Sequence, residues 1–260
     1  MENKTKSFAR LLTIMDELRE KCPWDKKQTF DSLRYLTIEE IYELSDAILD
    51  KDTQEIKKEL GDVLLHIVFY SRIASETNDF DIADVINSVC DKLVHRHPHI
   101  YSNVEVTDSE EVKKNWEKLK LKEGKASVLE GVPKSLPAIV KAFRIQEKVR
   151  GIGFDWDNKT QVWEKVLEEI EELKVEIEKK DQDRIESEFG DVLFALTNYA
   201  RFVDVNPEDA LERTNKRFIK RFQIMEKIIS NAGLNFDNMT LVEMDKYWND
   251  AKQISSKHNN

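Results

Sequence analysis

Two short acidic motifs could carry chemistry in this chain, and each occurs twice. The first places glutamates three positions apart, in IEEIYEL at residues 38–44 and in LEEIEEL at residues 167–173. The second places a glutamate and an aspartate three positions apart around a glycine, in ELGDVL at residues 59–64 and in EFGDVL at residues 188–193. Residues three apart on an α-helix share one face, so each motif predicts two carboxylates that project together. Converging carboxylates are suited to bind a hard divalent cation.

Helices must position these motifs, because apolar residues recur at three- and four-residue spacing through nearly the whole sequence. We predict an all-α fold with no strand. The predicted helices of the first half are residues 5–21, 31–50, 53–77, 81–96 and 108–123. Those of the second half are residues 137–150, 160–179, 183–203, 207–230 and 239–254.

The acidic positions of the two halves match at a constant offset of 129 residues (168 − 39 and 191 − 62). The matched positions are Glu39, Glu40, Glu43, Glu59 and Asp62 in the first half, and Glu168, Glu169, Glu172, Glu188 and Asp191 in the second. This register indicates two copies of one module. We predict modules at residues 1–124 and 137–260, joined by a linker at residues 125–136 where glycine, serine and proline gather.

Within each copy the two acidic helices are expected to pack antiparallel, because the connection between them is short. Glu43 and Glu59 each lie eight residues from Lys51, so both lie roughly 12 Å from the turn. The second copy repeats this spacing around Lys180. Helices packed about 8–10 Å apart would therefore surround one small space with carboxylates.

Two further features of the hairpin give specific expectations. Asp52 and Glu55 have the spacing of a capping box for the second acidic helix. Gly61 and Gly190, which lie between the paired acids, are expected to let the helix backbones approach closely.

A cluster of carboxylates is unfavourable by itself, because like charges raise one another's pKa and each poorly compensated buried ion costs several kcal/mol. A bound cation removes this conflict. Oxygen ligands without cysteine or a matching histidine favour Mg²⁺ first and Mn²⁺ second. A di-iron carboxylate site would need Glu-x-x-His pairs, and His66 is matched by Ala195, so that alternative is weak.

Composition excludes other classes of function. The formal net charge of −10 opposes broad binding to nucleic acids or anionic membranes. No apolar stretch approaches the roughly 18 residues of a membrane helix, and the N-terminus lacks the apolar core of a signal peptide. We predict a cytoplasmic protein.

Several further motifs, taken with the duplicated acids, resemble the MazG family of nucleoside triphosphate pyrophosphohydrolases over nearly the whole chain. They are KCPWD at residues 21–25, RHPHI at 96–100, EGVPKSLPA at 130–138, GFDW at 153–156 and NKRFIKRF at 215–222. The resemblance implies two tandem helical MazG-type modules, a homodimer, and Mg²⁺-dependent hydrolysis of nucleoside triphosphates to the monophosphate and pyrophosphate. Metal-activated water would attack the α-phosphate.

The resemblance also implies roles for individual residues. The catalytic residues would be Glu168, Glu169, Glu172, Glu188 and Asp191, and the last four of these would be metal ligands. Glu40, Glu43, Glu59 and Asp62 would form a second metal site in the first module. The nucleotide-binding residues would be Arg184, Arg217, Arg221, Trp248 and Lys252. Arg217 departs from the family pattern, which has lysine at this position, and this change alters the geometry of its hydrogen-bond donors.

The second module is expected to be the main catalytic unit. The position that matches Arg184 is Glu55 (184 − 129), and this reversal of charge would repel a phosphate in the first module. A rival interpretation from another class is a catalytically silent helical module for dimerisation or partner docking. Turnover of nucleoside triphosphates distinguishes the two interpretations.

Overall fold

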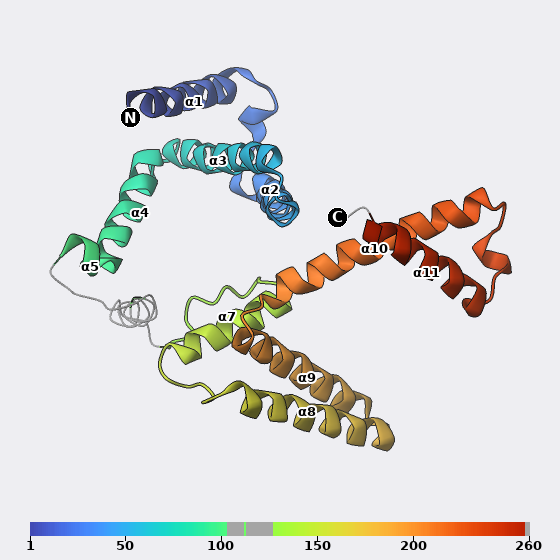
Figure 1. Cartoon of the computed structure of the whole chain (residues 1–260). Coiled ribbons are helices and arrows are strands. Elements are labelled where there is room, and N and C mark those ends of the chain that lie inside the picture. The colour runs from blue at the N-terminus through green and yellow to red at the C-terminus, as the bar shows by residue number, and fades with distance from the viewer. Residues whose placement is uncertain (103–111, 113–126, 258–260) are drawn as a thin grey trace. The chain divides into compact units, whose positions relative to one another are not determined.

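The structure, a computed structural model, describes residues 1–102, 112 and 127–257. The chain divides into two compact units, Met1–Val112 and Lys113–Asn260. All regular secondary structure in the described residues is helical, which confirms the predicted all-α fold (Figure 1). The predicted helix at residues 108–123 and the predicted module end at residue 124 lie outside the described residues, apart from Val112. The module boundaries therefore stay a prediction.

The nine predicted helices that fall on described residues begin and end within a few residues of the predicted positions, and three further short helices were not predicted. Unit 1 contains α1 (Glu2–Lys21), the short 3₁₀ helix η1 (Asp25–Lys27), α2 (Phe30–Asp50), α3 (Thr53–Ser75), α4 (Ile82–Arg96) and α5 (Pro98–Tyr101). Unit 2 contains α7 (Ala138–Arg150), α8 (Lys159–Lys179), α9 (Gln182–Phe202), α10 (Pro207–Asn231), the 3₁₀ helix η2 (Phe236–Asn238) and α11 (Leu241–Lys257). No helix in the described ranges is both long and apolar enough to cross a membrane.

Both acidic hairpins turn at the predicted lysines. Lys51 ends α2 with a φ of 58°, and Lys180 ends α8 with a φ of 60°. This left-handed conformation is uncommon for residues other than glycine, so its presence in both copies marks one conserved turn geometry. An aspartate then begins each following helix: Asp52 accepts hydrogen bonds from the amides of residues 54 and 55, and Asp181 accepts one from Arg184.

The predicted capping box at the start of α3 forms only in part. Asp52 caps the helix, but its own backbone amide donates to the carbonyl of Ala47 at 3.0 Å, so Glu55 has no amide to accept from there. Glu55 instead accepts a hydrogen bond from Lys58. The left-handed turn at Lys51 directs the Asp52 amide back to α2, which explains the difference.

Buried apolar residues hold each unit together. In unit 1, Met15 of α1, Leu33 of α2, and Val68 and Phe69 of α3 form one cluster. In unit 2, α8 and α9 pack against each other and α9 also packs on α7, while α10 packs on α7 and α11. Met225, Ile229 and Ala251 form the core between α10 and α11. Burial of side chains of this size contributes roughly 1.5–3 kcal/mol each.

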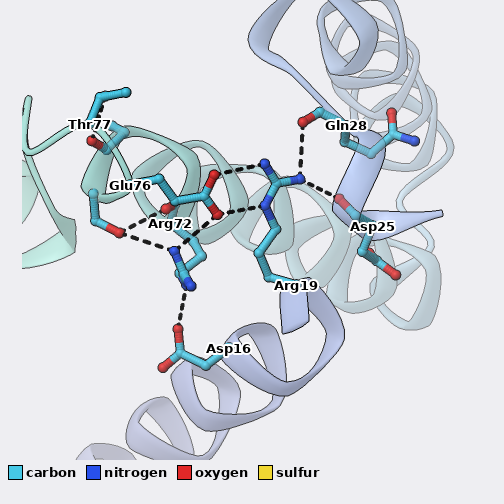
Figure 2. A network of polar contacts seen from close by, with 9 residues as sticks. Asp16, Arg19, Asp25, Gln28, Arg72, Glu76 and Thr77 are labelled. Carbon is cyan, nitrogen blue, oxygen red and sulfur yellow. Dashed lines mark hydrogen bonds and ion pairs between the residues drawn. The ribbon is translucent and has the colours of Figure 1, made fainter. Parts of the chain in front are cut away.

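A polar network fixes the turn that precedes the first acidic helix (Figure 2). Arg19 of α1 donates from Nε and Nη2 to the two carboxylate oxygens of Glu76 at 2.8 and 3.0 Å. Its Nη1 donates to the backbone carbonyls of Asp25 and Gln28. Arg72 of α3 also pairs with Glu76, at 3.1 Å. The network thus ties α1 and the end of α3 to the KCPWD segment.

Unit 2 fixes its matching turn through α9. Arg201, at the position of Arg72 (72 + 129), donates from Nη1 and Nη2 to the two carboxylate oxygens of Asp155 in the GFDW segment. Arg150 of α7 lies 3.7 Å from the same carboxylate. In each module, arginine side chains therefore hold the segment that precedes the first acidic helix. The residues that these arginines contact differ between the two modules.

Candidate active site

Three glutamates converge in each unit. Glu40 and Glu43 project from α2 toward Glu59 of α3, and one carboxylate oxygen from each lies within 4.8 Å of the others. We call these three residues the unit-1 cluster. The unit-2 cluster has the same spacing and consists of Glu169, Glu172 and Glu188. The antiparallel hairpins thus bring together residues 16 apart in sequence (59 − 43 and 188 − 172).

The unit-1 cluster concentrates negative charge in a partly buried place. Burial raises the pKa of Glu40, and the charges of Asp62, Glu43, Glu59 and Glu39 raise it further. Glu59 is only 3% exposed. The fully ionised cluster is therefore destabilising by itself and favours binding of a proton or a cation.

The unit-2 cluster has the same electrostatic character. Desolvation raises the pKa of Glu188 first, followed by the charges of Glu172, Asp191 and Glu169. Glu169 is 8% exposed and Glu188 is half-buried. Both units thus hold carboxylates that resist full ionisation.

The aspartates of the two motifs lie beside the clusters. Asp62 and Asp191 do not belong to the groups whose oxygens converge within 4.8 Å. Their charges nevertheless act on Glu40 and Glu188. Of the four ligands expected in each module, three converge directly and the fourth lies within electrostatic reach.

One buried oxygen of the unit-1 cluster has no partner. Glu59 Oε1 accepts from Lys58 at 2.8 Å, whereas Glu59 Oε2 has no hydrogen-bond donor among the described residues. A buried carboxylate oxygen without a donor costs free energy. This oxygen is therefore available to a cation.

One lysine in each unit partly neutralises the cluster, and neither of them was identified from the sequence. Lys165 of α8 lies 2.7 Å from Glu169 and 2.8 Å from Glu168, and these contacts raise the pKa of the Lys165 ammonium. In unit 1 the partner is Lys58 of α3. Lys165 and Glu169 lie four residues apart on a predicted helix, and this spacing could have predicted their ion pair. The unit-1 pair involves adjacent residues and gave no such signal.

The positions matching these lysines carry no charge, since Leu36 matches Lys165 (165 − 129) and Ser187 matches Lys58 (58 + 129). The two clusters therefore share their glutamates but differ in the positions of the lysines that pair with them.

The expected nucleotide-binding residues are distributed over three helices. Arg184 is exposed in the first turn of α9. Arg217 and Arg221 lie on α10, where Arg217 donates to Thr214 at 2.8 Å and Arg221 is half-buried with an unpartnered Nε. Trp248 and Lys252 lie on α11.

The α10–α11 hairpin keeps four of these residues together. The Trp248 ring lies 5.0 Å from the Phe218 ring and packs against the α10–α11 core, so Trp248 has a structural role as well. In the part of the chain that the structure describes, no hydrogen bond or ion pair joins these four side chains to the unit-2 cluster. Instead, α10 packs on α7 and α11.

The expectation about the two glycines is wrong for the helix pairs of this chain. Among the described residues, a Cβ atom at Gly61 or Gly190 would meet no neighbouring atom within 4 Å. Both glycines lie on exposed surface, so the packing of α2 on α3 or of α8 on α9 does not require them. Beside each glycine is a stripe of exposed apolar side chains at matching positions. The unit-1 stripe is Leu60, Leu64 and Ile67, and the unit-2 stripe is Phe189, Leu193 and Leu196.

Comparison with known proteins yields matches in each unit. The profile of the MazG nucleotide pyrophosphohydrolase domain matches residues 28–101 and again residues 158–225. The chain is 40% identical over 253 residues to a nucleoside triphosphate pyrophosphohydrolase of Escherichia coli K12, covering 94% of this chain and 96% of that protein. It is 43% identical over 250 residues to the nucleoside triphosphate pyrophosphohydrolase/pyrophosphatase MazG of Thermotoga maritima, covering 94% and 95%. A crystal structure of a mazG-related protein from Thermotoga maritima is 28% identical with a TM-score of 0.39, covering 44% of this chain and 98% of that one.

Proposed function

This chain belongs to the MazG nucleotide pyrophosphohydrolase family and is a hydrolase; we propose that it cleaves nucleoside triphosphates to the monophosphate and pyrophosphate with Mg²⁺ at the unit-2 cluster. The observation that carries the proposal is the convergence of Glu169, Glu172 and Glu188. Three carboxylates so close together repel one another, and a bound divalent cation would relieve that repulsion.

The residues of the clusters fit a hard divalent ion. The donor set is all oxygen, as Mg²⁺ prefers, and Mn²⁺ is the second choice. The unpartnered Oε2 of Glu59 in the matching unit-1 cluster supports the same conclusion. We propose that Glu169, Glu172, Glu188 and Asp191 hold the ion in unit 2. When bound, Mg²⁺ would supply Lewis-acid chemistry that polarises the phosphate and offsets charge growing on the leaving pyrophosphate.

The residues around the cluster then orient the substrate. Lys165 would place its ammonium beside the substrate phosphates, because its partner Glu169 is proposed as a metal ligand and the two groups lie 2.7 Å apart. Glu168 keeps a hydrogen bond with Lys165 at 2.8 Å and would hold that ammonium in position. Arg184 would bind a phosphate from the first turn of α9.

Arg217, Arg221, Trp248 and Lys252 complete the proposed nucleotide site from the α10–α11 hairpin. Since no hydrogen bond or ion pair among the described residues joins this hairpin to the cluster, we propose that the site is completed in a homodimer. The exposed apolar stripes beside Gly61 and Gly190 support this proposal, because large exposed apolar patches commonly mark interfaces. We also propose that the protein is cytoplasmic.

The unit-1 cluster is proposed as a second metal site. Glu40, Glu43 and Glu59 converge as closely as their counterparts, and Asp62 lies beside them. Glu55, at the position of Arg184, pairs with Lys58 at 3.4 Å. Unit 1 therefore binds a cation in our proposal but retains less affinity for a triphosphate.

The decisive experiment incubates the purified protein with several nucleoside triphosphates and Mg²⁺ and separates the products. Release of monophosphate and pyrophosphate, lost on addition of EDTA, is the expected result. Release of diphosphate and orthophosphate would mean that a different bond is cleaved. No turnover of any nucleotide would favour the silent dimerisation module.

A further inference from the structure

A cavity of about 480 Å³ lies in unit 2 between α7, α9 and the GFDW segment. This volume is within the range of roughly 300–1,000 Å³ found for small-molecule sites. Its lining is mainly apolar and includes three aromatic rings, Phe154, Trp156 and Phe194. Phe154 is 76% exposed, so this large ring is not used to fill the core of the unit.

A buried polar side chain also lines the cavity. Gln146 of α7 is 4% exposed, and its Nε2 donates to the backbone carbonyl of Phe194 at 2.9 Å. Its Oε1 accepts no hydrogen bond from the described residues. The carboxamide is thus oriented by one bond and leaves one acceptor unused. Such groups are rare in native structures, and each calls for an explanation.

The first module shows that the fold does not need a polar group at this position. The segment IMDELR at residues 14–19 matches IQEKVR at residues 145–150 with an offset of 131, so Gln146 corresponds to Met15. Met15 is 1% exposed and belongs to the apolar core of unit 1. Unit 2 therefore replaces a core methionine with an amide that has a free acceptor beside a cavity.

A second unpaired group lines the same cavity. Arg201 donates from Nη1 and Nη2 to Asp155, which also lines the cavity, but its Nε has no hydrogen-bond partner among the residues that the structure describes. The residues that line the cavity thus include one side chain with an unused acceptor, one with an unused donor, and aromatic rings. A planar heterocycle with both a donor and an acceptor on its edge is the ligand class that this set recognises.

The cavity adjoins the unit-2 cluster along one helix. Phe194 follows Asp191 by three residues and Glu188 by six on α9, which is about 4.5 and 9 Å of helix rise. We propose that the cavity binds a nucleobase, which donates an N–H to Gln146 Oε1. The choice of a nucleobase among planar heterocycles rests on the proposed function. The base belongs either to the substrate at the cluster or to a separate nucleoside.

The test measures nucleoside binding in the presence of EDTA, so that neither metal nor phosphate contributes. Adenosine carries an exocyclic amino group and purine riboside lacks it. By calorimetry, we expect the full chain to bind adenosine about 3- to 10-fold more tightly than purine riboside, as one hydrogen bond to a buried acceptor predicts. Absence of adenosine binding would overturn the proposal.

Three variants locate the effect. Gln146→Met, which installs the residue found at the matching position of unit 1, should abolish the difference between the two nucleosides. Gln182→Met, at the exposed start of α9, should leave the difference intact. Phe154→Ala should weaken binding of both nucleosides. Because the Phe154 ring is exposed, this variant should still fold. Persistence of full discrimination in Gln146→Met, or unchanged binding in Phe154→Ala, would refute the proposed contact.

Competition with substrate distinguishes whether the cavity binds the base of the substrate or that of a separate nucleoside. Competitive inhibition of triphosphate hydrolysis by adenosine assigns the cavity to the base of the substrate. Binding of adenosine without a change in KM assigns it to a separate nucleoside. If the wild-type protein binds adenosine but hydrolyses no triphosphate, the proposed function fails while the cavity assignment stands.

Discussion

Arg201 and Asp155 form a double hydrogen bond that joins the end of α9 to the segment before α8, with N–O distances of 2.7 and 2.5 Å. The Arg201 side chain is 8% exposed and that of Asp155 is 20% exposed. The pair lies at the cavity of unit 2 and at the entry to its first acidic helix. Its strength therefore affects both the fold and the site.

The stability of unit 2 should depend on the charge of Asp155. Burial raises the pKa of Asp155, but the hydrogen bond and charge of Arg201 outweigh this effect, and the pKa is lowered overall. A carboxylate with a lowered pKa stabilises the fold above its unfolded pKa of about 3.9. That contribution is lost as pH falls through the lower folded value. Asp155→Asn should reduce the free energy of unfolding at pH 7 by about 1–3 kcal/mol.

Denaturant titrations at pH 7 and below pH 4 check this prediction. The difference between Asp155→Asn and wild type should shrink at the lower pH. Asp157→Asn, a nearby exposed aspartate, is the matched control and should behave like wild type. Equal destabilisation at both pH values would show that the charge of Asp155 is irrelevant.

The two clusters should contribute unequally to catalysis. Glu172→Ala removes a proposed metal ligand in unit 2 and should abolish pyrophosphate release. Glu43→Ala makes the same change at the matching position of unit 1 and should leave much of the activity, because Glu55 there replaces Arg184. The measurement is initial-rate release of pyrophosphate at saturating Mg²⁺. Equal loss in the two variants would show that the proposed roles of the units are wrong.

Metal binding at unit 1 should be visible without turnover. The raised pKa of Glu40 means that the metal-free fold loses stability as pH rises through the unfolded value of about 4.3 toward the folded value. A divalent ion should reverse this loss, by about 2.7 kcal/mol at a concentration 100 times its Kd. Glu59→Gln should make the metal-free protein more stable and abolish the metal-induced gain from unit 1.

Thermal denaturation with Mg²⁺ or Mn²⁺ and with EDTA tests this prediction in a Glu172→Ala background, in which unit 2 lacks one of its proposed ligands. Glu55→Gln is the control, since it removes an exposed acid that also pairs with Lys58 but lies outside the cluster. A metal-induced gain that survives Glu59→Gln would count against the unit-1 site.

Alanine should stabilise the helices at the two exposed glycines. No atom in the described part of the chain would lie within 4 Å of a Cβ at Gly61 or Gly190, and glycine within a helix costs roughly 0.5–1 kcal/mol relative to alanine. Gly61→Ala and Gly190→Ala should each raise the free energy of unfolding by about that amount at low protein concentration. Lower stability, together with weaker self-association in sedimentation, would show that a second copy approaches the glycine.

Local sequence determined the helices, the repeat and the identity of the clustered acids. Helix periodicity, the aspartates that begin α3 and α9, and the turns at Lys51 and Lys180 depend on neighbours within a few residues, so a single sequence records them. The level positions of Glu172 and Glu188 follow from counting residues on either side of a short turn. The convergence of the three glutamates could therefore be predicted.

Tertiary structure alone decided which groups lie beside the clusters and which do not. Among the described residues, no hydrogen bond or ion pair joins Arg221 or Trp248 to the glutamates, α10 packs on α7 and α11, and no local pattern encodes this arrangement. The surroundings of Gly190 likewise depend on how α8 and α9 pack, and the free acceptor of Gln146 depends on how α7 packs on α9. Such contacts join residues about 50 positions apart, and their geometry arises from side-chain packing that periodicity does not describe.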